Sequence, residues 1–239
     1  MLESKEFSVY NNSQVIDEGL RNYMLKIYNY MAGGLSATAL SAYLIVTNKA
    51  LWSLFFTPTG LSALGWIALF APLILIFAFG SVLNRGTIGQ VQAMFWGFSA
   101  LMGVSLAPIF LIYTGASIAR VFLITAAAFG GLSLYGYTTK KDLSGWGSFL
   151  IMGVIGLIIA SIVNIFLKST GLDYALSYLT VFIFSGLVAY DTQTLRSAYY
   201  ANGYNEDLVA RGAIAGALSL YLDFINLFRA LLSIMGDRR

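Results

Sequence analysis

The sequence predicts an all-α membrane protein, built as a bundle of seven transmembrane helices. Its 239 residues are 58% hydrophobic and 10% charged, whereas soluble globular proteins carry about 25% charged residues. Seven apolar runs approach the roughly 20 residues that a helix needs to cross a bilayer. Most connections between the runs are short, which predicts that successive helices are antiparallel neighbours in one bundle. The lipid bilayer is therefore the first expected partner.

We expect the spans, in order, at residues 25–46, 61–83, 91–113, 117–137, 148–168, 174–196 and 213–235. Residues 1–22 form a polar N-terminal tail, too polar for a signal peptide, and residues 23–239 form a single transmembrane domain. The longest connections are expected at 47–60 and 197–212. Pro72 and Pro108 are expected to kink their helices.

Several classes of chemistry are excluded by composition. The chain has no Cys and no His, so disulfides, thiol catalysis and imidazole ligands are absent. The net charge of +3 is spread over loop ends, and no basic patch indicates a nucleic acid partner. We expect no cofactor and no enzymatic activity.

The distribution of Lys and Arg predicts the orientation. With the N-terminus in the cytoplasm, more Lys and Arg residues fall on the cytoplasmic side than on the opposite side, as the positive-inside rule requires. Seven spans then place the C-terminus outside. The expected location is a bacterial inner membrane.

Two carboxylates lie inside the last two spans: Asp191 in the sixth and Asp223 in the seventh. A charge at membrane depth costs about 2.5 kcal/mol or more, so each is a candidate functional residue. Counted from the cytoplasmic helix ends expected at residues 196 and 213, the acids lie about 8 Å and about 15 Å deep. Side-chain reach and helix tilt could bring them together.

If the two acids touch, they would share one proton and titrate as a unit. The protonated pair would hold its helices together by a hydrogen bond, and loss of the proton would push them apart or attract a cation. Carboxylate oxygen suits Ca²⁺, so Asp191 and Asp223 are also candidates for transient calcium binding.

Other charged and polar residues are candidates for supporting roles. Arg85 follows the second span at the expected cytoplasmic face, where it could pair with Asp191 as a latch, or could be only a loop-end charge. Secondary candidates are Tyr190 beside Asp191, Arg196 at the expected end of the same helix, and Arg229 inside the last span.

The segments GLVAYDTQTLR (186–196) and SLYLDFINLFRALLSIMG (219–236) resemble the Bax inhibitor-1 family of membrane proteins, and SLYGYTTKKDLSGWGSFL (133–150) resembles its bacterial members. The resemblance implies six helices around a central C-terminal helix. It implies a pH-dependent calcium leak controlled by an aspartate pair, here Asp191 and Asp223, with Arg85 as the latch. It also implies a possible role in stress or cell-death responses.

The function that we expect is a pH-sensitive calcium leak channel gated by the intramembrane aspartate pair. The alternative is an interaction protein without transport, which modulates a cell-death response or a membrane-bound AAA protease through residues 1–22. An intramembrane aspartyl protease is a weaker hypothesis, because the second acid lies in SLYLDF rather than a GxGD context. A purely structural role of the two acids in helix packing also stays open.

Overall fold

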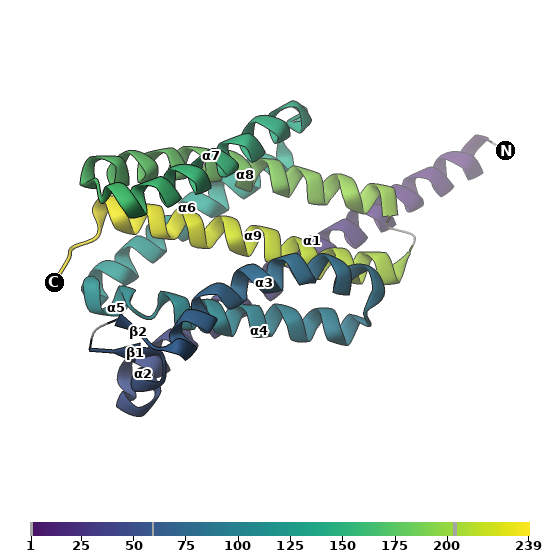
Figure 1. The fold of residues 1–239 in the computed structure, drawn as a ribbon. Coiled ribbons are helices and arrows are strands. Elements are labelled where there is room, and N and C mark those ends of the chain that lie inside the picture. The colour runs from purple at the N-terminus through teal and green to yellow at the C-terminus, as the bar shows by residue number, and fades with distance from the viewer. Residues whose placement is uncertain (1, 59, 203–204) are drawn as a thin grey trace.

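The computed structural model describes residues 2–58, 60–202 and 205–239, with side chains from residue 17 onward. Within these residues, seven helices are long and apolar enough to cross a membrane, so the predicted all-α membrane fold is confirmed. The long helices are α1 (Leu2–Thr47), α3 (Ala63–Arg85), α4 (Ile88–Leu106), α6 (Gly115–Thr138), α7 (Ser144–Leu167), α8 (Thr170–Asn202) and α9 (Glu206–Met235) (Figure 1).

Short elements join the long helices at one end of the bundle. The connection after α1 holds α2 (Lys49–Phe55) and a hairpin of β1 (Phe56–Thr57) and β2 (Gly60–Leu61), in which Phe56 pairs with Leu61. The third predicted span is interrupted near its end: α4 stops at Leu106, and the one-turn α5 (Ile109–Ile112) follows Pro108. Proline has no N–H to continue the helical ladder, so the break falls where it was expected to act.

Local sequence signals set several helix starts. Ser62 and Thr114 accept hydrogen bonds from the backbone N–H groups of Gly65 and Ser117. Thr87 and Gln90 form a reciprocal capping box at the start of α4. These contacts satisfy backbone donors that the first turn of a helix leaves unpaired.

Three boundaries differ from the sequence prediction. Helix α1 begins at Leu2, so the polar tail 1–22 is continuous with the first span instead of ending before it. Helix α8 continues to Asn202 and α9 begins at Glu206, so the predicted long connection at 197–212 is wrong. The sequence prediction stopped these helices where apolar residues end, but helical hydrogen bonds can continue beyond the bilayer into water.

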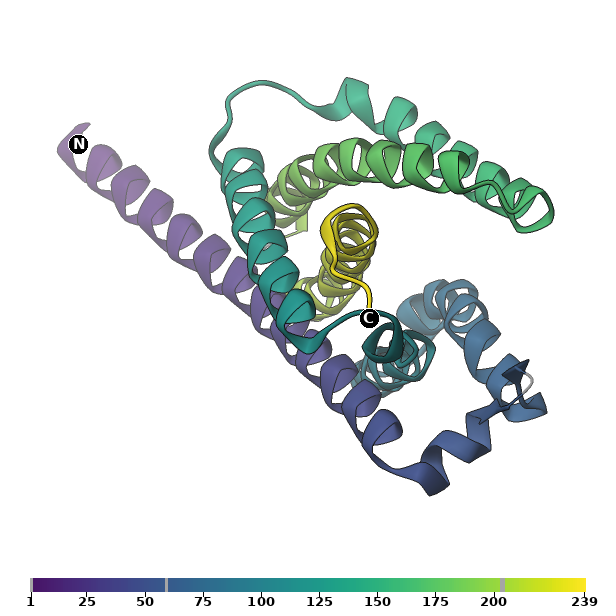
Figure 2. The same ribbon diagram turned by 90° about the vertical axis from the view of Figure 1, so that its left-hand side faces the viewer.

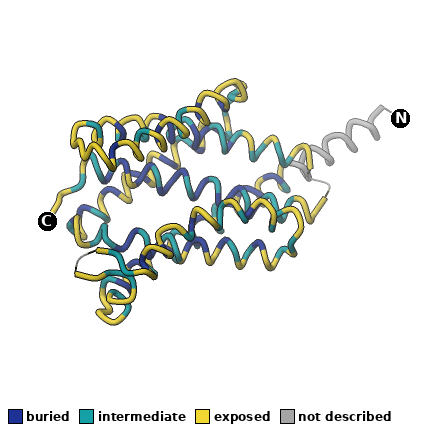
Figure 3. Tube along the Cα trace, viewed as in Figure 1, coloured by how far each residue is buried: buried dark blue, intermediate teal, exposed yellow. Residues whose placement is uncertain are grey.

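The C-terminal helix α9 lies at the centre of the bundle. Viewed along the bundle, the other long helices surround it (Figure 2), and α9 packs against α8, α1, α6 and α4. It is the most buried of the seven spans, whereas the strongly apolar α3 and α7 are the least buried. Buried positions accordingly gather along α9 (Figure 3). The central position implied for this helix is confirmed.

Close backbone contact between α6 and α8 depends on Gly136. A Cβ added at Gly136 would meet the carbonyl group of Ala189 and lie 2.9 Å from its Cα atom. Small residues at such positions allow membrane helices to approach closely.

We therefore predict that Gly136→Ala lowers thermal stability, with a cost of about 1–3 kcal/mol because backbone must move to make room. The matched control is Gly130→Ala in the same helix, where an added Cβ meets nothing within 4 Å. Thermal unfolding of both variants in detergent tests this expectation, and equal melting temperatures would contradict it.

Candidate functional site

The two intramembrane acids meet at the interface between α8 and α9, which is the most extensive helix–helix contact in the described structure. The Asp223 side chain comes from the central helix and is 4% exposed. Asp191 comes from α8 and is half-buried. The two carboxyl groups lie within hydrogen-bonding reach of each other. The structure therefore brings together the two residues that the sequence singled out.

The immediate partners of the two acids differ. The Ser219 hydroxyl, one turn before Asp223 on α9, donates to Oδ2 of Asp191. Oδ2 of Asp223, by contrast, is the one buried side-chain nitrogen or oxygen in the described part of the chain that has no hydrogen-bond partner. Buried polar atoms are nearly always paired, and an exception calls for an explanation.

Polar networks hold the helices around this pair. Tyr221 on α9 is fully buried, and its hydroxyl lies 2.6 Å from Oγ1 of Thr38 on α1. Thr38 in turn donates to the Ser99 carbonyl of α4 at 2.8 Å. On the other side, Thr192 of α8 bonds Ser133 of α6 at 2.9 Å. These contacts fix α8 and α9 relative to their neighbours.

Ser219 and Thr38, the partner of Tyr221, were not singled out from the sequence. Ser219 lies four residues before Asp223 and Tyr221 lies two before it, so helical periodicity places Ser219 on nearly the same face. That spacing could have identified Ser219. The partners Thr38 and Ser133 come from distant helices, and only the packing brings them here.

Arg85 does not reach Asp191 in this structure. It is exposed at the end of α3, and neither of the two ion pairs formed by the described side chains includes it. The physical reason is packing, because α3 lies against α4 rather than against α8. The arginine that links α3 to α9 is Arg211, which donates to the Leu83 carbonyl at 2.8 Å and pairs with Asp207 at 2.6 Å.

The secondary candidates are also positioned away from the acids. Tyr190 packs over Gly147 of α7, where an added Cβ would meet its ring. Arg196 donates to the Tyr137 carbonyl at 2.8 Å and lies over the rings of Tyr137 and Tyr200, so it joins α8 to α6. Arg229 lines a polar pocket at the other end of α9.

The two acids supply few ligands for a resident metal ion. Among the described residues, no group of three or more acidic side chains gathers at one place. Calcium usually takes six to eight oxygen ligands, so two carboxylates and the Ser219 hydroxyl suit a passing ion better than a bound one.

The sequence is similar to those of other proteins along most of its length. Residues 20–239 match the model of the family described as "Inhibitor of apoptosis-promoting Bax1". The chain belongs to this Bax inhibitor family. It is 43% identical to the inner membrane protein YbhL of Escherichia coli, over 92% of this chain and 94% of that protein. It is also 48% identical to an uncharacterized protein of Caulobacter vibrioides, over 94% and 92% of the two chains, and 44% identical to one of Rickettsia prowazekii, over 99% and 98%.

The family match covers both acids, most of the first apolar helix and all of the other six. The Bax inhibitor family is a membrane protein family and not a known enzyme family. The chain is therefore a polytopic membrane protein of this family, with the aspartate pair as its candidate functional site.

We predict that Tyr221→Phe destabilises the bundle by about 1 kcal/mol, because it removes one buried interhelical hydrogen bond and leaves Thr38 with one partner fewer. Tyr178→Phe is the control, since Tyr178 is 61% exposed on α8. Thermal unfolding in detergent compares them, and a loss of the same size in both variants would argue against the contact.

Proposed function

We propose that the chain is a pH-sensitive cation leak channel of the Bax inhibitor type, with calcium as its ion and the Asp191–Asp223 pair as its gate. The observation that carries this proposal is the meeting of the two carboxyl groups on α8 and the central α9, where one buried Asp223 oxygen has no donor among the described side chains.

A shared proton accounts for that unpaired oxygen. Leaving a buried acceptor without a partner costs about 1–3 kcal/mol, and more for a charged group. A proton held between Asp191 and Asp223 supplies the missing donor and bonds the two helices at the same time. Such a pair titrates as a unit.

The direction of the pH effect follows from the charges. At low pH the pair holds its proton, and α8 stays bonded to α9. As pH rises the proton is lost, and two negative charges face each other. At a separation of about 4 Å and an effective dielectric constant of about 20, they repel by about 4 kcal/mol. That energy changes a two-state equilibrium by nearly three orders of magnitude, so the leak should increase with pH.

An apolar layer lies next to the pair along the same interface. Its core is formed by Phe184 and Leu187 on α8 and Leu227 on α9, all of which are at least 90% buried. On α8, Phe184 and Leu187 lie between Asp191 and the residues that line the polar pocket beyond. On α9, the pocket lining begins at Asn226, directly before Leu227. A cation could pass along this interface only if the layer parted, which is the movement that repulsion between the acids would drive.

The proposed orientation places the N-terminus in the cytoplasm of a bacterium, with the bundle in the inner membrane. The supports are the excess of Lys and Arg on that side and the inner membrane location in the name of the Escherichia coli relative. In this orientation the Arg211 link between α3 and α9 faces the cytoplasm.

For the gate, we predict that calcium flux into liposomes containing the wild-type chain rises as pH increases. Asp191→Asn or Asp223→Asn should remove this pH dependence, because an amide donates to the remaining carboxylate without releasing a proton. Asp142→Asn is the control: Asp142 is exposed and accepts a hydrogen bond from the Ser144 N–H in the turn before α7, a contact that Asn can also make. If calcium flux in both acid variants depended on pH as it does in the wild-type chain, the proposed mechanism would be contradicted.

The alternative role is an interaction protein that modulates a membrane-bound protease, such as an AAA protease, or a cell-death response without transport. The observation that favours it is the length of α1, which starts at Leu2, whereas the apolar run expected to cross the membrane begins only near residue 25. The side chains of residues 1–16, where most of the expected contact lies, are outside the described residues.

Removal of residues 2–16 distinguishes the two roles. The channel proposal predicts that pH-dependent flux into liposomes survives, because the described acids and their partners lie after residue 16. The interaction role predicts a truncated chain that no longer copurifies with a membrane protease, and double Asp→Asn variants that still do.

A further inference from the structure

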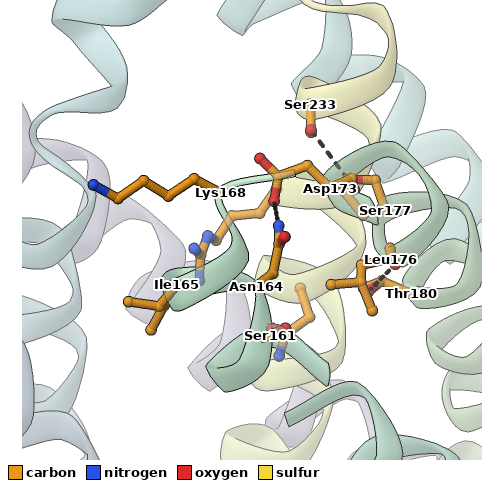
Figure 4. Close-up of a pocket in the computed structure, with 12 residues that line it drawn as sticks. Ser161, Asn164, Ile165, Lys168, Asp173, Leu176, Ser177, Thr180 and Ser233 are labelled. Carbon is orange, nitrogen blue, oxygen red and sulfur yellow. Dashed lines mark hydrogen bonds between the residues drawn. The ribbon is translucent and has the colours of Figure 1, made fainter. Parts of the chain in front are cut away.

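A polar pocket lies at the end of the bundle where α7 turns into α8, beyond the apolar layer from the two acids. Its volume is about 610 Å³, and α7, α8 and α9 line it. Figure 4 shows that its labelled side chains are mostly hydroxyls, amides and charged groups. The pocket is open to the outside, since its charged residues Lys168, Asp173 and Arg229 are exposed. Polar and charged groups gathered in this way within membrane helices are candidate functional sites.

The wall of the pocket is held in place by its own hydrogen bonds. Asn164 near the end of α7 accepts from the Ser169 N–H at 3.0 Å and donates to the Asp173 carboxylate at 2.8 Å (Figure 4). Across the pocket, Ser177 of α8 donates to Ser233 of α9 at 3.0 Å. The pocket is therefore a built feature that joins three helices.

The charges around the pocket are unbalanced. Arg229 and Lys168 are positive, and Asp173 is the one acidic residue in the lining. Asp173 is already engaged by Asn164. No hydrogen bond or ion pair to the Arg229 side chain is formed by the described residues; the two ion pairs there use Arg120 and Arg211. The first turn of the 33-residue helix α8 adds the partial positive charge of a helix N-terminus.

The Arg229 side chain is exposed in the pocket and has no partner among the described residues. Arg229 lies six residues before the end of α9 at Met235, which is about 9 Å along the helix axis. Charged side chains inside membrane bundles normally pair or face a wet cavity. Arg229 faces such a cavity, and an anion bound there would also give it a paired charge.

From this geometry we propose that the pocket is a binding site for a phosphate group, carried either by an anionic lipid or by free phosphate, with Arg229 as its principal ligand. The planar guanidinium matches two phosphate oxygens at once. Lys168 adds a second charge at the rim, and the Ser161 hydroxyl is available on α7. The neighbouring Ile165 is 68% exposed, so the pocket is open on a side from which a lipid headgroup could enter. This site does not depend on the proposed channel function.

The test uses the full chain purified in detergent, with two probes. Native mass spectrometry measures retention of phosphatidylglycerol against a phosphate-free glycolipid, and thermal shift measures stabilisation by inorganic phosphate. Whichever of the two probes binds the wild-type chain, we expect Arg229→Gln to weaken its binding by about tenfold or more, since a charge-assisted hydrogen bond is lost. Arg229→Lys should restore part of it, because charge remains but the two-pronged geometry does not.

Arg120→Gln is the matched control. Arg120 is an exposed arginine at the same end of the bundle, where it pairs with Asp237 at 2.8 Å, and its loss should leave both probes unaffected. Ser161→Trp keeps Arg229 but fills the pocket, so it tests the site even if Arg229→Gln does not fold, and it should also abolish binding.

The outcomes separate the sources of the phosphate. Selective retention of phosphatidylglycerol that is lost in Arg229→Gln and Ser161→Trp supports a lipid site. A shift with inorganic phosphate that the same variants lose supports a free-anion site. If neither probe binds, or if both variants bind as wild type does, the proposal is overturned.

Discussion

The need to keep the polar groups of α9 out of lipid is the constraint on which the rest of the fold depends. This helix carries a carboxyl group, a buried tyrosine hydroxyl and an arginine within nine residues, Tyr221 to Arg229. None of these groups can face hydrocarbon without a large cost. Apolar side chains are as stable in contact with lipid as in contact with protein, so the strongly apolar α3 and α7 can lie at the periphery of the bundle. The less apolar α9 must lie inside.

Hydrogen bonds between helices convert that constraint into one defined packing. Tyr221 is joined to Thr38, and Thr192 to Ser133, so the central helix and α8 are each tied to a different outer helix. Each of these hydroxyl groups therefore has a hydrogen-bond partner. Among the described residues, the one buried side-chain oxygen or nitrogen without a partner is Oδ2 of Asp223. Proteins tend to break their own packing rules at functional sites, and this exception falls where the sequence placed its most costly residues.

Along the helix axes, the interface between α8 and α9 has two polar regions with an apolar region between them. The acid pair lies toward one end of the interface and the Arg229 pocket toward the other, with Phe184 and Leu187 of α8 between them. The two polar regions have opposite charge: the ionised acids are negative, and the pocket has a net positive charge. A cation drawn to the acids would be opposed by Arg229, and a bound phosphate would reduce that opposition. The two proposed sites therefore fit one path, although each stands on its own observations.

The seven apolar helices, the membrane class and the choice of Asp191 and Asp223 as candidate residues could be predicted from the sequence, because each follows from the cost of placing a side chain in lipid. Helix ends near residues 196 and 213 could not be predicted, since helices continue into water on hydrogen bonds that hydropathy does not register. The tertiary structure alone decided that Arg85 lies apart from Asp191, that Ser219 donates to it, and that Arg229 faces a pocket. These outcomes depend on which helices pack together, and a linear pattern of apolar residues does not specify that choice.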